Sequence, residues 1–241
     1  MICPASGYDR FVILTINCIV DAKERAGFDR HIVPRLAEIA GRRAEIVHFE
    51  QLQDSTPHDE CTHVLISGSE LSAAQHLPTD DALLSFIRRT VDDGLPVLGI
   101  CYGHQMIARA FVDDGACRRA AVPEFGFKRL TLAANPLFDG IETLVPVHSH
   151  YDEVADLPPD QFDVIATTDD CAVQAFQLKG HPVWGVQFHP ELDERSGRRM
   201  LERNLETEAA ARERFVDELT DPAQIEGCRR LFENFFRAKR R

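Results

Sequence analysis

The first half of the chain alternates short apolar segments with segments of helical periodicity, and this alternation limits the folds open to it. Strands are expected at four apolar runs, residues 11–16, 45–49, 63–67 and 96–100. Helices are expected at residues 29–41, 80–93 and about 104–112, where apolar positions recur at helical spacing. Strands that alternate with helices predict a mostly parallel central sheet covered by helices on both faces, a three-layer α/β fold.

The second half of the sequence changes character. Five strand-like segments with short turns between them follow, at residues 129–132, 144–148, 164–168, 173–178 and 183–188, and we expect them to include a smaller antiparallel extension. From Asp193 the sequence is helical and charged to residue 219, and Asp221-Pro222 breaks it before a last amphipathic helix. We interpret the stripe of Phe232, Phe235 and Phe236 on that helix as core.

No repeat, linker or shift of composition divides the chain. We expect residues 1–241 to form a single domain, with a core of about 11–191 and a helical C-terminal extension of about 192–241. The formal net charge of −12 disfavours a nucleic-acid partner, because polyanion-binding proteins present a basic face. No apolar stretch reaches membrane-spanning length and Met1–Gly7 lacks the pattern of a signal peptide, so we expect a cytoplasmic protein without a membrane partner.

Seven cysteines are spread along the sequence, at positions 3, 18, 61, 101, 117, 171 and 228. Their odd number and the absence of a C-x-x-C pair argue against a disulfide framework and a zinc ribbon. Six of them fit the role of small buried apolar side chains. Cys101 differs, because it lies in Gly99-Ile100-Cys101-Tyr102-Gly103, between an apolar strand and a helix.

The glycines two positions before and after Cys101 permit a sharp, strained turn that exposes the side chain of a nucleophile. Such a turn also places the sulfur at the N-terminus of the next helix, where unpaired N–H groups and the helix dipole favour negative charge. A buried cysteine beside helix-packing glycines accounts for the same five residues equally well. The pattern alone therefore leaves a nucleophilic and a structural role open.

A matching base follows downstream in Phe188-His189-Pro190-Glu191. A nucleophilic thiol needs a base to take its proton, and histidine suits neutral pH. Glu191 can share a face with His189 in extended chain and fix the tautomer of its ring. The strand-and-loop segment Leu65–Ser69 offers backbone N–H groups that complete an oxyanion hole. Together the three segments favour a nucleophilic role for Cys101.

These motifs resemble those of the class I, or triad, glutamine amidotransferases. The likeness rests on Gly99-x-Cys101-x-Gly103-His104-Gln105 and on Phe188-His189-Pro190-Glu191. More narrowly, Ser149-His150-Tyr151-Asp152-Glu153-Val154 and Ala172–Phe176 resemble the amidotransferase domain of GMP synthetase and its stand-alone relatives. The likeness runs in family order from about Val12 to Glu191, and it implies a flavodoxin-like architecture with no cofactor and no metal.

The resemblance implies hydrolysis of the glutamine side-chain amide through a γ-glutamyl thioester, giving glutamate and ammonia. Cys101 would be the nucleophile, His189 the general base and acid, and Glu191 the residue that orients His189. The N–H groups of Tyr102 and Gly68 would form the oxyanion hole.

The resemblance also implies a binding site for the amino-acid end of L-glutamine. Gln105 matches the position that holds this end, and Ser149, His150 and Tyr151 match the segment whose backbone contacts it. Many family members have Gly-Gly-Pro in the oxyanion loop, where this chain has Gly68-Ser69-Glu70. Glu70 adds a negative charge near the expected oxyanion, which could alter substrate choice or loop mobility.

Two features leave the physiological reaction open. The sequence after the amidotransferase region holds no Gly-rich phosphate loop, so an ammonia-accepting synthetase would be a separate chain. The same triad also serves a γ-glutamyl peptide or γ-glutamyl amine hydrolase, and a regulatory or subunit-binding module without turnover is a further alternative. His148, His150 and Asp152 could serve as metal ligands on one strand face, but no further ligand cluster is evident, and we expect no metal.

Overall fold

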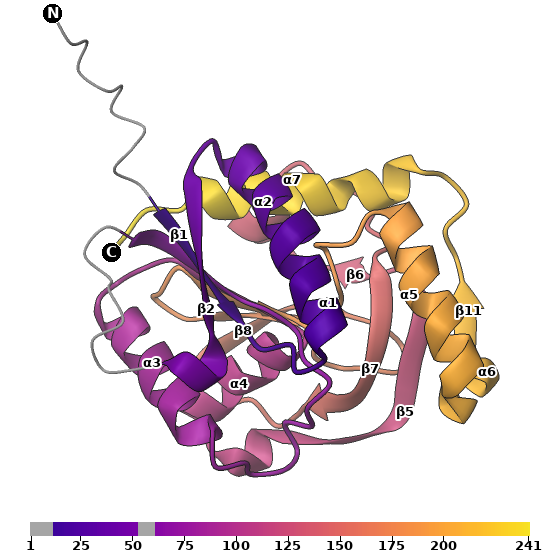
Figure 1. Cartoon of the computed structure of the whole chain (residues 1–241), viewed down its shortest axis with the longest axis horizontal. Helices are drawn as coiled ribbons and strands as arrows, with labels where there is room; N and C mark the ends of the chain where they lie inside the picture. The colour runs from indigo at the N-terminus through magenta and orange to yellow at the C-terminus, as the bar shows by residue number, and fades with distance from the viewer. Residues whose placement is uncertain (1–11, 53–60) are drawn as a thin grey trace, which may run out of the picture.

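The computed structural model describes residues 12–52 and 61–241, and its centre is an eight-stranded sheet (Figure 1). The strand order is β2 (Arg43–His48), β1 (Val12–Asn17), β3 (Cys61–Ile66), β4 (Val97–Ile100), β10 (Val183–Val186), β9 (Ala175–Leu178), β8 (Phe162–Thr167) and β6 (Thr131–Leu132). The first five strands in this order run parallel, and the last three pair antiparallel. The mostly parallel sheet with an antiparallel extension is therefore confirmed.

Helices cover both faces of this sheet, which confirms the three-layer fold (Figure 1). Helices α2 (Val33–Ala40) and α7 (Ala223–Arg237) lie on one face, and α3 (Asp80–Asp92) and α4 (Tyr102–Phe111) lie on the other. Successive side chains of β1 point to opposite faces of the sheet. Ile13 packs in the α2–α7 cluster, and Leu14 packs in the α3–α4 cluster. Phe232, Phe235 and Phe236 of α7 are buried in the first of these clusters, as the sequence predicts.

The predicted elements of the first half are all present in the described residues, with one helical segment longer than expected. The four strands lie within two residues of the predicted bounds. The helix expected at residues 29–41 begins earlier, as α1 (Ala22–Gly27) and a π-helical turn (Phe28–Ile32) that continue into α2. Asp21 caps α1 by accepting hydrogen bonds from the N–H groups of Lys23 and Glu24. Gly41 ends α2 in the left-handed conformation, at φ 61°.

A second, three-stranded sheet was only partly predicted. Its order is β11 (Phe215–Asp217), β5 (Cys117–Phe127) and β7 (Val147–Val154). No strand pattern is visible in the sequence over β5, because that segment contains charged residues and Pro123, and the structure shows that antiparallel pairing with β7 forms it. The strand predicted at residues 144–148 lies further along, as β7.

The region expected to be helical from Asp193 to residue 219 is instead interrupted by β11. Helices α5 (Glu194–Thr207) and α6 (Ala209–Arg214) precede it, and the chain then pairs in parallel with β5. Gly126 of β5 makes this pairing possible, since a Cβ atom there would overlap the carbonyl oxygen of Val216. The break at Asp221-Pro222 before α7 is confirmed. Three short 3₁₀ turns complete the described elements, at Phe49–Gln51, Asp114–Ala116 and Pro136–Phe138.

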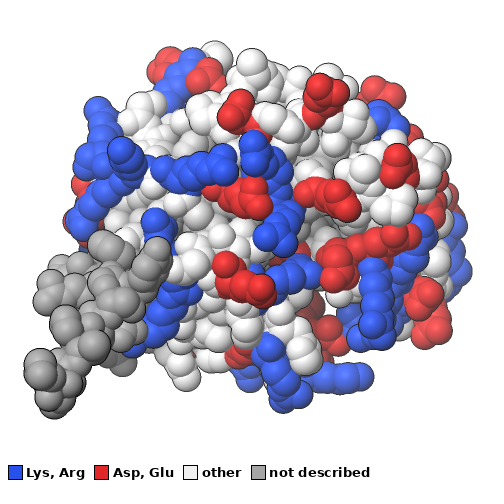
Figure 2. Space-filling model, turned by 90° about the horizontal axis from the view of Figure 1, so that it is seen from above, with Lys and Arg blue, Asp and Glu red and all other residues white. Residues whose placement is uncertain are grey.

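The surface on the side of α2 and α7 carries both signs of charge. Figure 2 shows acidic and basic side chains interleaved over this side, without a field of one sign. Across residues 12–52 and 61–241, no helix combines the length and the apolar character that crossing a bilayer requires. The predictions that fall on Met1–Gly7, Cys3 and Phe11 lie outside the described residues.

Candidate active site

Cys101 lies on a strained turn between β4 and α4. Its backbone has φ 51° and ψ −103°, and among the described residues only Asp156 is another non-glycine residue with positive φ. The flanking glycines are required by packing. A Cβ atom at Gly99 would overlap the carbonyl of Gly103, and one at Gly103 would lie 2.5 Å from the carbonyl oxygen of Ile66. The sharp turn expected from the sequence is therefore present, and it seats α4 directly against β3 and β4.

The other described cysteines behave as buried thiols. All six cysteines in the described part of the chain are buried. Burial raises the pKa of Cys117 and of Cys171 to about 12, and it raises the pKa of Cys18 and of Cys228 as well. These four thiols therefore stay protonated at neutral pH. Cys101 has a different neighbourhood, because its sulfur interacts with a buried histidine side chain and raises the pKa of that ring.

That histidine is His189, which follows β10 and pairs with Glu191. Nδ1 of His189 lies 2.8 Å from Oε1 of Glu191, and both side chains are buried. The backbone N–H of His189 donates to the carbonyl oxygen of Val147 at 2.8 Å, which fixes the residue against β7. Burial alone disfavours a charged imidazolium, but the carboxylate of Glu191 and the sulfur of Cys101 outweigh it. The pKa of His189 therefore lies well above its ordinary value of 6.5.

Gly68, in the loop after β3, lies against both Cys101 and His189. A Cβ atom at Gly68 would lie 3.4 Å from Cβ of Cys101 and 3.2 Å from Cε1 of His189. The carbonyl oxygen of Ser67 accepts a hydrogen bond from the N–H of Gly103 at 3.2 Å. Because the peptide group is planar and trans, the N–H of Gly68 points away from Gly103. The turn that carries Cys101 thus also sets the direction of this N–H.

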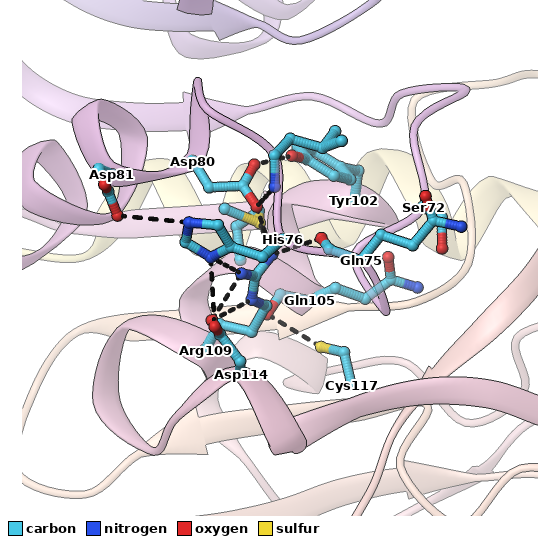
Figure 3. Close-up of polar contacts among 12 residues, drawn as sticks. Ser72, Gln75, His76, Asp80, Asp81, Tyr102, Gln105, Arg109, Asp114 and Cys117 are labelled. Atoms are coloured by element: carbon cyan, nitrogen blue, oxygen red, sulfur yellow. Dashed lines mark hydrogen bonds and ion pairs between the residues drawn. The ribbon is translucent and has the colours of Figure 1, made fainter.

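A buried ion pair holds Tyr102, the residue after Cys101 (Figure 3). The Tyr102 hydroxyl donates to Oδ1 of Asp80 at 3.0 Å, and a terminal nitrogen of Arg109 donates to Oδ2 of the same carboxylate at 2.7 Å. The side chains of Asp80 and Arg109 are fully buried, and Arg109 also contacts Asp114 at 2.6 Å. Burial and the neighbouring Asp80 raise the pKa of Tyr102. The cluster therefore fixes the first turn of α4, including the backbone N–H of Tyr102.

Sequence reasoning missed this cluster. Arg109 and Asp80 lie on two helices where charged residues are usually solvated, and no local pattern pairs them. The one available signal is spacing, because Arg109 lies two helical turns after Tyr102 and so shares its face of α4.

The residues expected to bind substrate are held by hydrogen bonds to other parts of the fold. The side-chain amide nitrogen of Gln105 donates to the carbonyl oxygen of Asp152 at 3.1 Å and to Oε1 of Gln187 at 3.0 Å. The Ser149 hydroxyl accepts from Asn204 at 2.7 Å. The Tyr151 hydroxyl donates to Glu208 at 2.7 Å. The side chains of Ser149 and Tyr151 thus point toward α5 and its C-terminal end.

His150 points the other way, into a buried polar cluster with Glu124 and His148. Ligand atoms of these three residues lie within 4.8 Å of one another, which is close enough for a shared metal ion. Glu124, however, already receives hydrogen bonds from His150 at 2.9 Å, from the side chains of Gln174 and Thr168, and from the Lys128 ammonium. Lys128 supplies the positive charge that a metal would bring, so the donor set fits a buried ion pair better than a metal site.

The same contacts also keep Glu124 charged. Burial disfavours a charged carboxylate, yet hydrogen bonds from His150 and Lys128 hold the pKa of Glu124 well below its ordinary value. Asp152, which the sequence grouped with His148 and His150 as a metal ligand, lies outside the cluster. Its carboxylate accepts instead from the Ser72 hydroxyl at 2.5 Å.

Arg35 of α2 is a further contact to the triad that sequence reasoning missed. Its guanidinium donates to the backbone carbonyl of Glu191 and forms an ion pair with Asp193 at 2.9 Å. Asp193 is in turn the N-cap of α5. Arg35 therefore ties Glu191 and Asp193 to α2, and Asp193 also joins this segment to α5.

Comparison with known proteins places the chain in a defined group. A family model described as glutamine amidotransferase class-I matches residues 20–207. The chain is 32% identical, over 164 residues, to a subunit of the glutamine-hydrolysing GMP synthase of Pyrococcus furiosus, covering 67% of this chain and 83% of that protein. It is 35% identical, over 156 residues, to the corresponding GMP synthase subunit of Methanothermobacter thermautotrophicus, covering 64% of this chain and 81% of that protein.

Among solved structures, a glutamine amidotransferase from Thermotoga maritima superimposes with a TM-score of 0.71. That match covers 95% of this chain and 99% of the other at 20% identity, and it therefore supports the fold.

Proposed function

The chain belongs to the class I glutamine amidotransferase family, and on that premise we propose that it hydrolyses the side-chain amide of L-glutamine through a thioester on Cys101. The observation that carries this proposal is the convergence of three separate segments. Cys101 after β4, the His189–Glu191 pair after β10 and Gly68 after β3 all meet at the carboxyl edge of the parallel strands. Ligands of open α/β sheets bind at this edge.

The first half of the reaction uses each of these groups. Cys101 gives its proton to His189, and its sulfur attacks the amide carbon of glutamine. The carbonyl oxygen becomes an oxyanion, which accepts hydrogen bonds from the N–H groups of Gly68 and Tyr102. His189 then donates its proton to the leaving nitrogen, the C–N bond breaks, and ammonia and a γ-glutamyl thioester on Cys101 result.

Water completes the turnover. His189 takes a proton from water as the oxygen attacks the thioester carbon, and it returns this proton to the sulfur as the C–S bond breaks, so that glutamate leaves and the Cys101 thiol is restored. Glu191 accepts the hydrogen bond from Nδ1 throughout and stabilises the imidazolium form of His189. The raised pKa of His189 supports this role, because the ring must hold a proton until it passes it to the leaving nitrogen.

The amino-acid end of glutamine is assigned to the segment around β7. We assign its contacts to the main chain of Ser149, His150 and Tyr151, since the side chains of these residues are engaged elsewhere. Gln105 supports the segment by its hydrogen bond to the carbonyl oxygen of Asp152. Residues 1–241 act as one catalytic unit in this proposal, because buried side chains of α7 belong to the same core cluster as Cys101.

The ammonia is assigned to a separate synthetase chain. Two relatives of the chain are described as subunits of a glutamine-hydrolysing GMP synthase. An ATP-dependent synthetase that accepts ammonia is therefore the partner class that the likeness supports.

Ammonia release from L-glutamine, measured with and without such a synthetase, tests the proposal. Cys101→Ala should abolish release while glutamine binding stays measurable by calorimetry. Cys61→Ala is the matched control. Cys61 is as buried as Cys101, at 7% exposure, but it is the first residue of β3 and so lies at the end of that strand away from Gly68. This variant should keep full activity. Amine release from γ-glutamyl amines without ammonia release from glutamine would identify a γ-glutamyl hydrolase instead.

A further inference from the structure

The loop that carries Gly68 is fastened to the loop after β1 on both sides of Gly68. On one side, the N–H of Cys18 donates to the Ser67 hydroxyl at 2.8 Å. On the other side, the N–H of Val20 donates to Oε2 of Glu70 at 2.9 Å. Two neighbouring loops at the carboxyl edge of the sheet are thus joined by two hydrogen bonds that bracket the expected oxyanion-hole residue.

The inner of these links is buried. The Ser67 hydroxyl accepts from Cys18 and also donates to the carbonyl oxygen of Gly68 at 2.8 Å. Beyond Gly68, Ser69 makes a local turn by accepting from the N–H of Leu71 at 3.1 Å. The outer link through Glu70 is the hydrogen bond nearest to Gly68 on its far side that reaches another part of the fold, and Ser72 makes the next one, to Asp152.

The attachment point of Glu70 is itself fixed. The side chain of Asn17, at the end of β1, accepts from the N–H of Ile19 at 2.9 Å and donates to Asp29 at 2.7 Å. Asp21 then caps α1. Val20 lies between Ile19, whose N–H is held by Asn17, and Asp21, which caps α1. Its N–H therefore has a defined direction, and the Glu70 carboxylate binds a fixed partner.

This geometry changes the role that the sequence suggests for Glu70. A carboxylate beside an oxyanion hole opposes the developing negative charge, but the Glu70 side chain is exposed and turned toward Val20. Water and salt screen an exposed charge strongly, whereas a hydrogen bond to a fixed N–H keeps its directional effect. The acceptor function of the side chain is therefore the dominant one.

We infer that Glu70 is a positioning residue that holds the loop of Gly68, and with it the oxyanion-hole N–H, by its hydrogen bond to the backbone of Val20. The inference rests on the proposed function and adds a residue that the usual Gly-Gly-Pro loop of this family does not have. Because an oxyanion forms only as the reaction proceeds, loss of the link affects kcat more than KM.

Two substitutions separate the acceptor from the charge. Glu70→Gln keeps a side-chain oxygen that accepts from Val20 but removes the charge, and its kcat should stay within about twofold of the wild type. Glu70→Ala removes the acceptor, and its kcat for glutamine hydrolysis should fall about tenfold with little change of KM. This loss is smaller than the roughly 10²–10³ that follows removal of an oxyanion donor, because the donor is displaced rather than deleted.

Glu218→Ala is the matched control. The Glu218 carboxylate is also exposed and also accepts a backbone N–H, that of Arg129 at 2.6 Å, but it follows the edge strand β11 rather than the oxyanion loop. This variant should keep the wild-type kcat, because Glu218 lies on the β11 side of β5 and none of its hydrogen bonds within the described residues involves Cys101, His189 or Gly68. Equal losses of kcat in Glu70→Gln and Glu70→Ala would overturn the inference, since they would show that the charge matters and the hydrogen bond does not.

Hydrogen exchange of the Val20 amide tests the link independently of turnover. The amide should be protected in the wild type and in Glu70→Gln and should exchange faster in Glu70→Ala. Faster exchange with an unchanged kcat would overturn the positioning role. A wild-type protein without ammonia release would refute the proposed function instead, and the exchange rates alone would then decide whether Glu70 holds the loop.

Discussion

Replacing Glu191 by glutamine removes one charge from the buried pair that it forms with His189 and keeps the shape of the side chain. Nδ1 of His189 still finds an oxygen acceptor near its present distance of 2.8 Å, so the ring keeps its orientation. The imidazolium form loses its nearest negative partner. The variant therefore tests how much of the rate depends on the charge of Glu191 rather than on its hydrogen bond.

The size of the effect follows from the geometry. Two unit charges about 4 Å apart interact by about 4 kcal/mol at the effective dielectric constant of about 20 that suits protein sites. The cost of burying both charges cancels part of this energy. The full amount corresponds to about a thousandfold in rate, so we expect kcat to fall by about a hundredfold. His189→Ala should cost more, at least about a thousandfold, because it removes the proton carrier itself.

The same charge predicts a pH dependence of stability. The pKa of His189 in the folded protein lies well above 6.5, so protonated His189 contributes stability that is fully present below pH 6.5 and is lost as pH rises through the folded pKa. Glu191→Gln should therefore lower the midpoint of thermal unfolding most at about pH 6, and the difference from the wild type should shrink at alkaline pH.

Steady-state ammonia release and thermal unfolding across this pH range measure both effects. Glu233→Gln serves as a control, because it removes a carboxylate that pairs with Arg229 on α7 and should leave kcat unchanged. A Glu191→Gln variant with wild-type kcat, or one whose destabilisation grows with pH, would refute the charge-based account of the His189–Glu191 pair.

Three further predictions concern groups around the triad. Gly68→Ala should lower kcat by more than about tenfold in an ammonia-release assay, because the added methyl would press against His189 and Cys101 at 3.2 to 3.4 Å. Arg109→Met should lower the free energy of unfolding by about 3–5 kcal/mol in a denaturant titration, since it leaves a buried carboxylate unpaired. Lys128→Met should raise the pKa of Glu124, which is depressed in the folded protein. The loss of stability should therefore be greatest at neutral pH and smaller as pH falls toward the carboxyl range. Unfolding measured at pH about 7 and about 4 would show the difference.

Local patterns in the sequence were sufficient for the elements that position Cys101. The apolar runs of β1, β3 and β4 and the helical periodicity of α3 are set by residues close in sequence, and they predict the parallel sheet. The glycines at 99 and 103 predict the turn, because only a residue without a side chain permits the observed approach of α4 to the strands.

Elements formed by distant partners could not be predicted in this way. Strand β5 contains Pro123 and exposed charges, and it exists because β7 pairs with it. Strand β11 depends on the missing side chain of Gly126, which no pattern within residues 215–217 reveals. Predicting either one requires the pairing partner to be known first.

The same limit applies to charged groups of the candidate site. Lys128 and Arg109 resemble ordinary surface residues in the sequence, yet each is paired with a carboxylate inside the fold. The sequence points to the charge of Glu70, whereas the structure shows in addition that its carboxylate accepts from a backbone N–H on the neighbouring loop. Burial and partner, rather than residue type, decide what each of these charges does.

The central claim is that Cys101 is the acyl acceptor, and labelling by a chloroketone analogue of L-glutamine tests it most directly. One equivalent should alkylate Cys101, as peptide mass spectrometry would show, and ammonia release should disappear in proportion to the label. Excess glutamine should slow the labelling, and Cys101→Ala should remain unlabelled. Loss of activity with the label on a different residue, or full labelling of Cys101 with activity retained, would contradict the claim.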